Sequence, residues 1–186
     1  MQFTITFHGP FHVATGTAEQ GIDRTVDPDA LLPASSLKGL MRAAAAEQLG
    51  VAGAVVDAVF GADPTRPDRD RTRRLRPSPW WWSDAALVGA KVTNITQIRV
   101  DDETGTTDRG FLMFGQHVWA EAATFDVEQR DPVDDLALHT LVLNGAARAI
   151  VSLGGQRRRG EGWVTVTGEP WTLQHTAQLM ALRGRR

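Results

Sequence analysis

The chain has 186 residues, 42% of them hydrophobic, which is enough for one domain with a substantial core and excludes global disorder. Its formal net charge of −2 excludes a globally basic nucleic-acid binder, so any contact with a polyanion must come from a local patch. The absence of cysteine excludes disulfides, thiolate metal sites and thiol catalysis. With no membrane-length apolar run and no signal peptide, we expect a cytoplasmic protein without membrane contact.

The first part of the chain predicts a strand followed by a long helix. Phe3, Ile5 and Phe7 alternate with threonines, which indicates a half-buried strand. Residues 33–49 predict a helix with Ser35 or Ser36 as its N-cap and Gly50 at its C-terminal end. A shorter helical piece ends near residues 59–61, and the charged, proline-rich residues 62–79 predict a disordered surface loop.

The remainder predicts a strand over residues 80–87, a protruding loop or hairpin over 94–110, and strand material over 111–129. A second helix opens at Asp131 and Pro132, and a last strand covers residues 163–167. The order β-α-β-β-α-β predicts an α+β, ferredoxin-like (RRM-like) single domain. We place this domain at residues 1–170, followed by a short basic tail with helical potential at residues 171–186.

Residues 153–162 combine four glycines with three consecutive arginines. Glycine lets a backbone approach a ligand closely, and guanidinium groups bind phosphate oxygens in a forked geometry. A polyanion is therefore the predicted partner of Arg157, Arg158 and Arg159, and the alternative is a tight turn with solvated arginines. A second basic patch lies between Arg66 and Arg76.

Several motifs together resemble the RAMP superfamily of CRISPR-associated proteins, and in particular the backbone subunit of type III effector complexes of the Csm and Cmr kinds. The resemblance runs from the first strand to about Thr167. Its most specific part is the Pro33-Ala34-Ser35-Ser36-Leu37-Lys38-Gly39 segment. The other motifs, in chain order, are Phe11-His12-Val13, Gly21-Ile22-Asp23, Val59-Phe60-Gly61, Ser83-Asp84-Ala85 and the glycine loop that contains Gly154, Gly155, Gly160 and Gly162.

The resemblance implies a subunit that binds guide RNA (crRNA), associates with copies of itself into a filament-like backbone, and contacts complementary target RNA and other CRISPR effector subunits. The helix opened by Ser35 and Ser36 resembles the element that grips the guide backbone. A helix N-terminus suits phosphate, and Lys38 and Arg42 share one helix face. The alternative for these two cations is a solvated helix surface.

Residues 94–110 resemble a thumb that inserts into the guide–target duplex. Ile98 would wedge a base step, and Arg99 and Arg109 would touch phosphate. The alternative is an ordinary surface hairpin.

The resemblance also implies that Asp23 is the catalytic residue of a metal-dependent cleavage of target RNA. A loop carboxylate can hold a divalent ion such as Mg²⁺ or Mn²⁺ near a scissile phosphate. The alternative is a turn-forming aspartate, since Asp27 and Asp29 lie close by. The chain would then be a non-catalytic structural subunit.

The five histidines are His8, His12, His117, His139 and His175. His8 and His12 are four residues apart, but they follow a predicted strand and not a helix, so the sequence predicts no metal cluster among the five. A guide-processing endoribonuclease that uses His12 as a general acid or base is a third possibility. A packed or hydrogen-bonded His12 is the competing interpretation.

Overall fold

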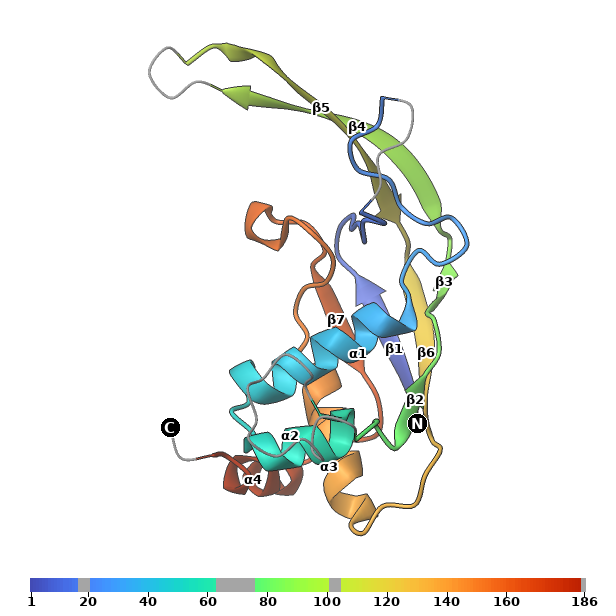
Figure 1. Ribbon diagram of the computed structural model, residues 1–186, viewed down its shortest axis with the longest axis vertical. Helices are drawn as coiled ribbons and strands as arrows, with labels where there is room; N and C mark the ends of the chain where they lie inside the picture. The colour runs from blue at the N-terminus through green and yellow to red at the C-terminus, as the bar shows by residue number, and fades with distance from the viewer. Residues whose placement is uncertain (17–20, 63–75, 101–104, 185–186) are drawn as a thin grey trace.

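The computed structural model describes residues 1–16, 21–62, 76–100 and 105–184 (Figure 1). Most of the loop expected to be disordered, residues 63–75, and the tip of the expected thumb, residues 101–104, lie outside the described residues. The main sheet contains five strands, which are β1 (Gln2–Phe7), β2 (Trp80–Trp82), β3 (Ala86–Val88), β6 (Ala122–Gln129) and β7 (Val164–Thr167).

The strand order of the main sheet is β2-β6-β1-β7, with β3 also paired to β6. Each pairing is antiparallel, so β1 and β2 run in the same direction with β6 between them. Phe3 lies opposite Phe125 on one side of β1, and Ile5 lies opposite Val166 on the other. This order is the split βαβ that the sequence predicts, and the predicted fold class is confirmed.

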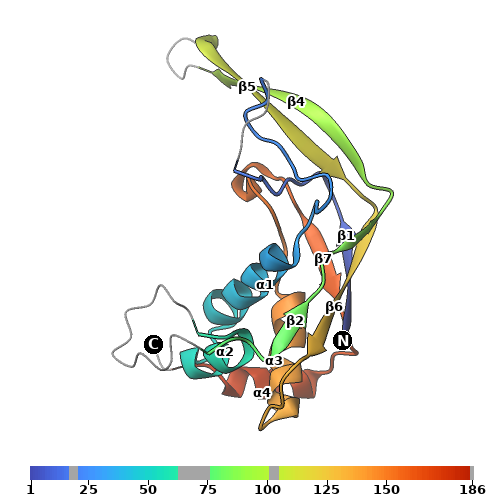
Figure 2. The ribbon, with the colours of Figure 1, turned by 45° about the vertical axis from the view of Figure 1, so that its right-hand side comes forward.

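Helices cover one face of this sheet (Figure 2). The helices are α1 (Ala34–Ala43), which continues through a π-helical turn η1 (Ala44–Gln48), α2 (Gly53–Phe60), α3 (Leu136–Arg148) and α4 (Leu173–Ala181). Residues of β1 alternate between exposed and buried because only one face is covered. Phe3 and Phe125 stack within the core, where Leu37 and Met41 of α1 are also fully buried.

Two predicted helix starts are wrong. The N-cap of α1 is Pro33, and neither serine caps it, because the Asp84 carboxylate accepts a hydrogen bond from the Ala34 amide at 2.7 Å. The other helix, α3, begins at Leu136 and is capped by Asp135, several residues beyond the predicted start. The glycine at the end of the first helical segment is confirmed, since Gly50 has a φ of +69°.

The tryptophan segment forms two short strands in place of the single predicted one. β2 ends at Trp82, and β3 begins at Ala86. Ser83 still pairs with Asp126 through both its backbone amide and its hydroxyl. Trp80 and Trp82 are buried while Trp81 is exposed, as alternation along a strand requires.

Strands β4 (Lys91–Val100) and β5 (Thr107–Trp119) form a separate two-stranded hairpin that projects beyond the main sheet (Figure 1). The predicted protrusion is confirmed, and it is longer than the predicted residues 94–110. Its register shifts between Ile98 and Val100. Several large apolar side chains of the hairpin are exposed, including those of Ile98, Leu112 and Phe114.

The residues of the predicted C-terminal tail fold back onto the domain. Leu179 of α4 is buried beside Gly145 of α3, and Val51 forms a bridge with Arg183. In the described part of the chain, every helix is too short or too polar to cross a bilayer.

A buried hydrogen bond links β2 to α3 and makes stability depend on pH. The Trp80 indole donates to Nδ1 of His139 at 2.9 Å, so His139 must be neutral there. Burial lowers the pKa of His139 below its ordinary value of 6.5, and the nearby Asp135 and Asp134 offset only part of this shift.

We expect the free energy of unfolding to be highest above pH 6.5 and to fall as the pH drops from 6.5 toward the lowered pKa, because the unfolded chain binds the proton more readily. In His139→Gln, which keeps an acceptor for Trp80, this loss between pH 7.5 and 5.5 should be smaller. Urea unfolding of both proteins at several pH values measures it. An identical pH dependence would contradict the assignment.

Candidate functional site

Three segments that are distant in sequence meet where the hairpin joins the main sheet. They are the loop after β1, the base of β4 and β5, and the glycine loop of residues 153–162. Phe11 pairs with Val118 of β5, and Arg24 forms a parallel bridge with Gly115. The Gly155 amide donates to the His12 carbonyl at 2.9 Å. Backbone contacts therefore hold all three segments together.

The glycines of the loop are required by close packing. A Cβ on Gly162 would lie 1.9 Å from the Leu153 carbonyl oxygen, and one on Gly154 would lie 2.3 Å from the His12 carbonyl oxygen. Both glycines have positive φ. A Cβ on Gly155 would clash with the His12 ring at 2.5 Å. Only Gly160 faces open space, so three of the four glycines have a structural role beside any contact with RNA.

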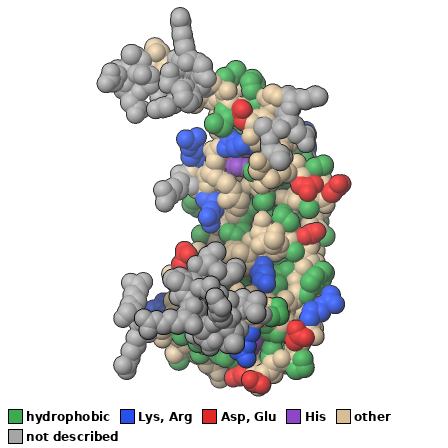
Figure 3. All heavy atoms as spheres, viewed as in Figure 1, with side chains coloured by type: hydrophobic (Ala, Val, Ile, Leu, Met, Phe, Trp, Pro, Cys, Tyr) green, Lys and Arg blue, Asp and Glu red, His purple; other side chains and the backbone are tan. Residues whose placement is uncertain are grey.

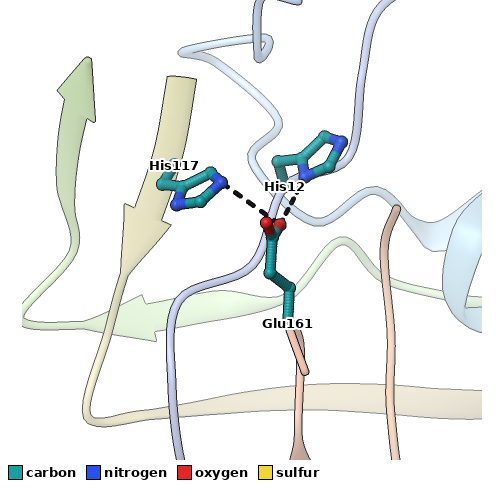
Figure 4. Close-up of side chains that lie close together, drawn as sticks. All are labelled: His12, His117 and Glu161. Atoms are coloured by element: carbon teal, nitrogen blue, oxygen red, sulfur yellow. Dashed lines mark hydrogen bonds and ion pairs between the residues drawn. The ribbon is translucent and has the colours of Figure 1, made fainter. Parts of the chain in front are cut away.

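A buried cluster of His12, His117 and Glu161 lies at this junction (Figure 4). One Glu161 carboxylate oxygen lies 3.3 Å from Nδ1 of His12 and 3.1 Å from Nε2 of His117. The exposed fractions of the three residues are 4%, 8% and 9%. Burial lowers the pKa of His12, which outweighs the opposing effect of the Glu161 carboxylate, and Arg24 adds to the lowering.

A polar network extends from this cluster into the hairpin. Arg24 donates to the Gln97 side chain at 2.6 Å, and the amide groups of Gln97 and Gln156 are hydrogen bonded to each other at 3.0 and 3.2 Å. Gln97 also reaches the second Glu161 oxygen at 3.5 Å. The network links the loop after β1, the strand β4 and the glycine loop through side chains.

Asp23 lies on the surface beside β5. Its backbone amide donates to the Phe114 carbonyl at 2.9 Å, and its carboxylate accepts from the Phe114 amide at 2.8 Å. Within the described residues its second carboxylate oxygen has no hydrogen-bond partner. Asp27 accepts a hydrogen bond from the Asp29 amide in a local turn. The structure therefore places Asp23 beside the middle of the hairpin, next to the Thr96–Phe114 pair, with one oxygen anchored and the other free of any partner among the described residues.

The arginine turn is a short 3-10 helix, η3 (Arg157–Arg159), flanked by Gln156 and Gly160 in left-handed conformations. Arg157 and Arg159 are exposed, and the side chain of Arg158 lies outside the described part of the structure. Ser152, Gln156, Arg157 and Arg159 line an open hollow of about 470 Å³. Figure 3 shows basic side chains on the part of this face just below the hairpin.

The cations predicted on α1 already have partners inside the domain. Arg42 donates to Asp57 at 2.6 Å and also to the Gly61 carbonyl. Lys38 lies over the Trp82 ring at 5.2 Å, and its pKa is lowered by burial and by Arg42. Ser35 is exposed and Ser36 is half-buried. Because Asp84 occupies the first amide of the helix, this end offers less to a phosphate than the arginine turn does.

The hairpin presents Ile98 to solvent, as a wedge residue requires. The side chains of Arg99 and Arg109 lie outside the described residues. The predicted RNA-binding residues belong to two elements, α1 and the glycine loop that contains the arginine turn. Each assignment to RNA stays a prediction.

The histidine–glutamate cluster is not predicted by the sequence. His12 and His117 are 105 residues apart, and no local pattern links them. Glu161 lies between two glycines in the glycine loop, and a carboxylate next to three arginines is the one local signal of the cluster. The sequence predicts no such cluster among the histidines, whereas the structure brings two of them together with a carboxylate; whether they bind a metal is a separate question.

Comparison with known proteins agrees with this architecture. The family model of the RAMP superfamily matches residues 4–165. A chain of a type III-B Cmr-beta complex bound to cognate target RNA is similar in structure, with a TM-score of 0.67, 13% identity and coverage of 89% of this chain and 95% of that chain. A chain of the same kind of complex in the apo state has a TM-score of 0.65 and 13% identity, with coverage of 94% and 97%. No curated protein sequence is significantly similar.

Two glycine substitutions separate packing from backbone strain. Gly160→Ala places a Cβ in open space at a φ of +86°, so we expect a loss of about 1–2 kcal/mol from the left-handed conformation alone. Gly162→Ala adds a clash with backbone, so we expect a larger loss, of about 3 kcal/mol or more. Chemical denaturation measures both, and equal losses would contradict the packing role.

Proposed function

The chain belongs to the RAMP superfamily, and from this premise we propose that it is a guide-RNA-binding backbone subunit of a type III CRISPR effector complex. The similar solved chains come from type III-B Cmr-beta complexes, one of them bound to target RNA, which supports this class of assembly. Its partners would be crRNA, complementary target RNA, other effector subunits and further copies of itself along the guide.

The exposed arginine turn beside the hairpin is the observation that carries the RNA-binding part of the proposal. Arg157 and Arg159 line an open hollow with Gln156, and the Gln156 amide is hydrogen bonded to Gln97 of the hairpin. An RNA phosphate in this hollow would meet guanidinium groups that no described acidic side chain neutralises. The same strand would then pass the root of the hairpin, where Ile98 points outward farther along β4.

We further propose that Asp23 takes part in divalent-metal-dependent cleavage of target RNA. A bound Mg²⁺ or Mn²⁺ would neutralise charge at the scissile phosphate. Asp23 fits such an ion as a single ligand, because one of its oxygens has no partner among the described residues and Mg²⁺ commonly combines one carboxylate with substrate phosphate oxygens and water. The hydrogen bond from Phe114 would fix the carboxylate's orientation beside the middle of the hairpin.

A non-catalytic structural subunit is the second candidate. In that case the role of Asp23 would be structural, since its hydrogen bonds to Phe114 hold the loop after β1 on β5. A guide-processing enzyme that uses His12 has less support, because that ring is buried against Gly155 and Glu161. An imidazole in this position has no open path to a ribose hydroxyl.

Replacing Arg157, Arg158 and Arg159 together by alanine should weaken binding to a guide-length RNA. The slope of log K against log salt should become shallower by up to about 2, because each lost contact to a single strand contributes about 0.7. Filter binding at several salt concentrations measures both quantities. Arg130→Ala is the matched control, since Arg130 is an exposed arginine placed over Trp81.

The control should bind as the wild type does. An unchanged affinity and slope in the triple variant would remove the arginine turn from the RNA path. An equal loss in the triple variant and in Arg130→Ala would indicate a general charge effect.

Asp23→Ala should lower the rate of cleavage of complementary RNA by at least about a hundredfold in the complex assembled with guide RNA. Target binding should persist, because the substitution removes a negative charge from the phosphate path. Cleavage by the wild type should require a divalent ion and stop with chelator. Gel assays of cleavage and binding test this, with Asp27→Ala as the control that keeps wild-type cleavage.

Wild-type rates in Asp23→Ala, together with an inactive His12→Ala and no need for a divalent ion, would replace this mechanism by acid–base cleavage at His12. Absence of cleavage in every variant and in the wild type would favour the non-catalytic subunit.

A further inference from the structure

The cluster of His12, His117 and Glu161 has no part in the proposed chemistry at Asp23, yet its geometry is that of a ligand set. Nδ1 of His12, Nε2 of His117 and a Glu161 oxygen all lie within 4.8 Å of one another. They come from the loop after β1, from β5 and from the glycine loop (Figure 4). Three donor atoms from three segments therefore point at one small volume.

One nitrogen of the cluster has no hydrogen bond to any described residue. Nε2 of His117 is buried and, although a Glu161 oxygen lies 3.1 Å away, the direction does not suit a hydrogen bond. A buried polar atom without a partner is destabilising, and an ion is one of the recognised explanations for such an atom. A cation between the three side chains would give the lone pair of His117 a partner.

The distances agree with this explanation. A regular tetrahedron with metal–ligand bonds of about 2.05 Å has an edge of about 3.3 Å. The two nitrogen–oxygen separations in the cluster are 3.3 Å and 3.1 Å. A carboxylate and two imidazoles at this spacing could therefore receive an ion through small side-chain rotations.

We propose that His12, His117 and Glu161 bind a divalent transition-metal ion, with zinc as the foremost candidate. Two imidazole nitrogens and one carboxylate oxygen form a ligand set typical of zinc, whereas Mg²⁺ and Ca²⁺ prefer oxygen ligands alone. Three protein ligands leave a fourth position for water.

The surroundings of the cluster support the same assignment. Gln97 approaches the other Glu161 oxygen at 3.5 Å, so an outer partner orients the carboxylate. The His12 ring lies directly on Gly155, where a Cβ would clash, so the ring cannot move far from its position. The ion would join the hairpin base to the two loops, and its role would be to fix the RNA-facing junction, independently of any cleavage at Asp23.

Metal content and cobalt spectroscopy of the full, tag-free chain test the proposal. After treatment with chelator and dialysis against Zn²⁺, the wild type should retain about one ion per chain. Co²⁺ in place of Zn²⁺ should give the visible absorption of a four-coordinate site. Saturating Zn²⁺ should raise Tm by roughly 5–10 °C at a hundredfold excess over Kd.

Glu161→Gln keeps the size of the side chain, and His117→Ala removes a ligand from the hairpin. Each should weaken Zn²⁺ binding by more than about a hundredfold, since even outer partners of metal ligands contribute 10- to 100-fold. His8→Ala is the matched control, because His8 is an exposed histidine whose ring is hydrogen bonded to the Thr165 hydroxyl at 2.7 Å, outside the cluster; its Zn²⁺ affinity should equal that of the wild type.

A wild type that retains no ion after dialysis, or a six-coordinate cobalt spectrum, would overturn the proposal. Equal Zn²⁺ affinity of the wild type and both ligand variants would also overturn it, since the ion would then bind elsewhere. Should either variant fail to fold, the stoichiometry and cobalt spectrum of the wild type decide alone.

Discussion

Direct contact between backbones at the glycine loop is the constraint on which the junction depends. The loop passes so close to the His12 carbonyl and to its own Leu153 carbonyl that no side chain fits at Gly154 or Gly162. Hydrogen bonds from Gly155 to His12 and from Gly162 to Pro10 close the contact. Because backbone atoms set the spacing, the positions of the flanking side chains follow from it, including those of the arginine turn.

The close contact of the glycine loop also buries the carboxylate of Glu161. Glu161 follows Gly160 into the interior, where an isolated negative charge would be strongly destabilising. Two imidazoles and the Gln97 amide surround it. Arg42, by contrast, neutralises Asp57 within the helical layer. The cations of α1 thus stabilise the domain, and those of the arginine turn remain available to a ligand.

The sequence predicts the sheet well because alternation along β1, β6 and β7 is a local signal. Phe3, Ile5 and Phe7 are buried as their spacing requires. The N-cap of α1 could not be predicted, since the capping carboxylate is Asp84, 50 residues away along the chain.

The same limit applies to the candidate site. Composition and resemblance single out Asp23 and the arginines, but no sequence pattern predicts that His117 lies close to His12. That proximity comes from the pairing of the loop after β1 with β5, which is a long-range contact that no local pattern contains.

The length of the β4–β5 hairpin makes its outer end sensitive to small changes at its root. From Lys91 to Val100 the strand extends roughly 30 Å, given about 3.3 Å per residue. A rotation of about 10° at the root would therefore displace the far end by about 5 Å, which is more than the spacing of two stacked bases in a nucleic acid. Hydrogen bonds at Gln97, Phe114 and Gln116, which lie along the hairpin beyond its root, tie it to the loop after β1 and oppose that rotation. The single substitution Gln97→Ala would therefore change the direction of the outer end of the hairpin and the contacts that this end makes, while the domain stays folded.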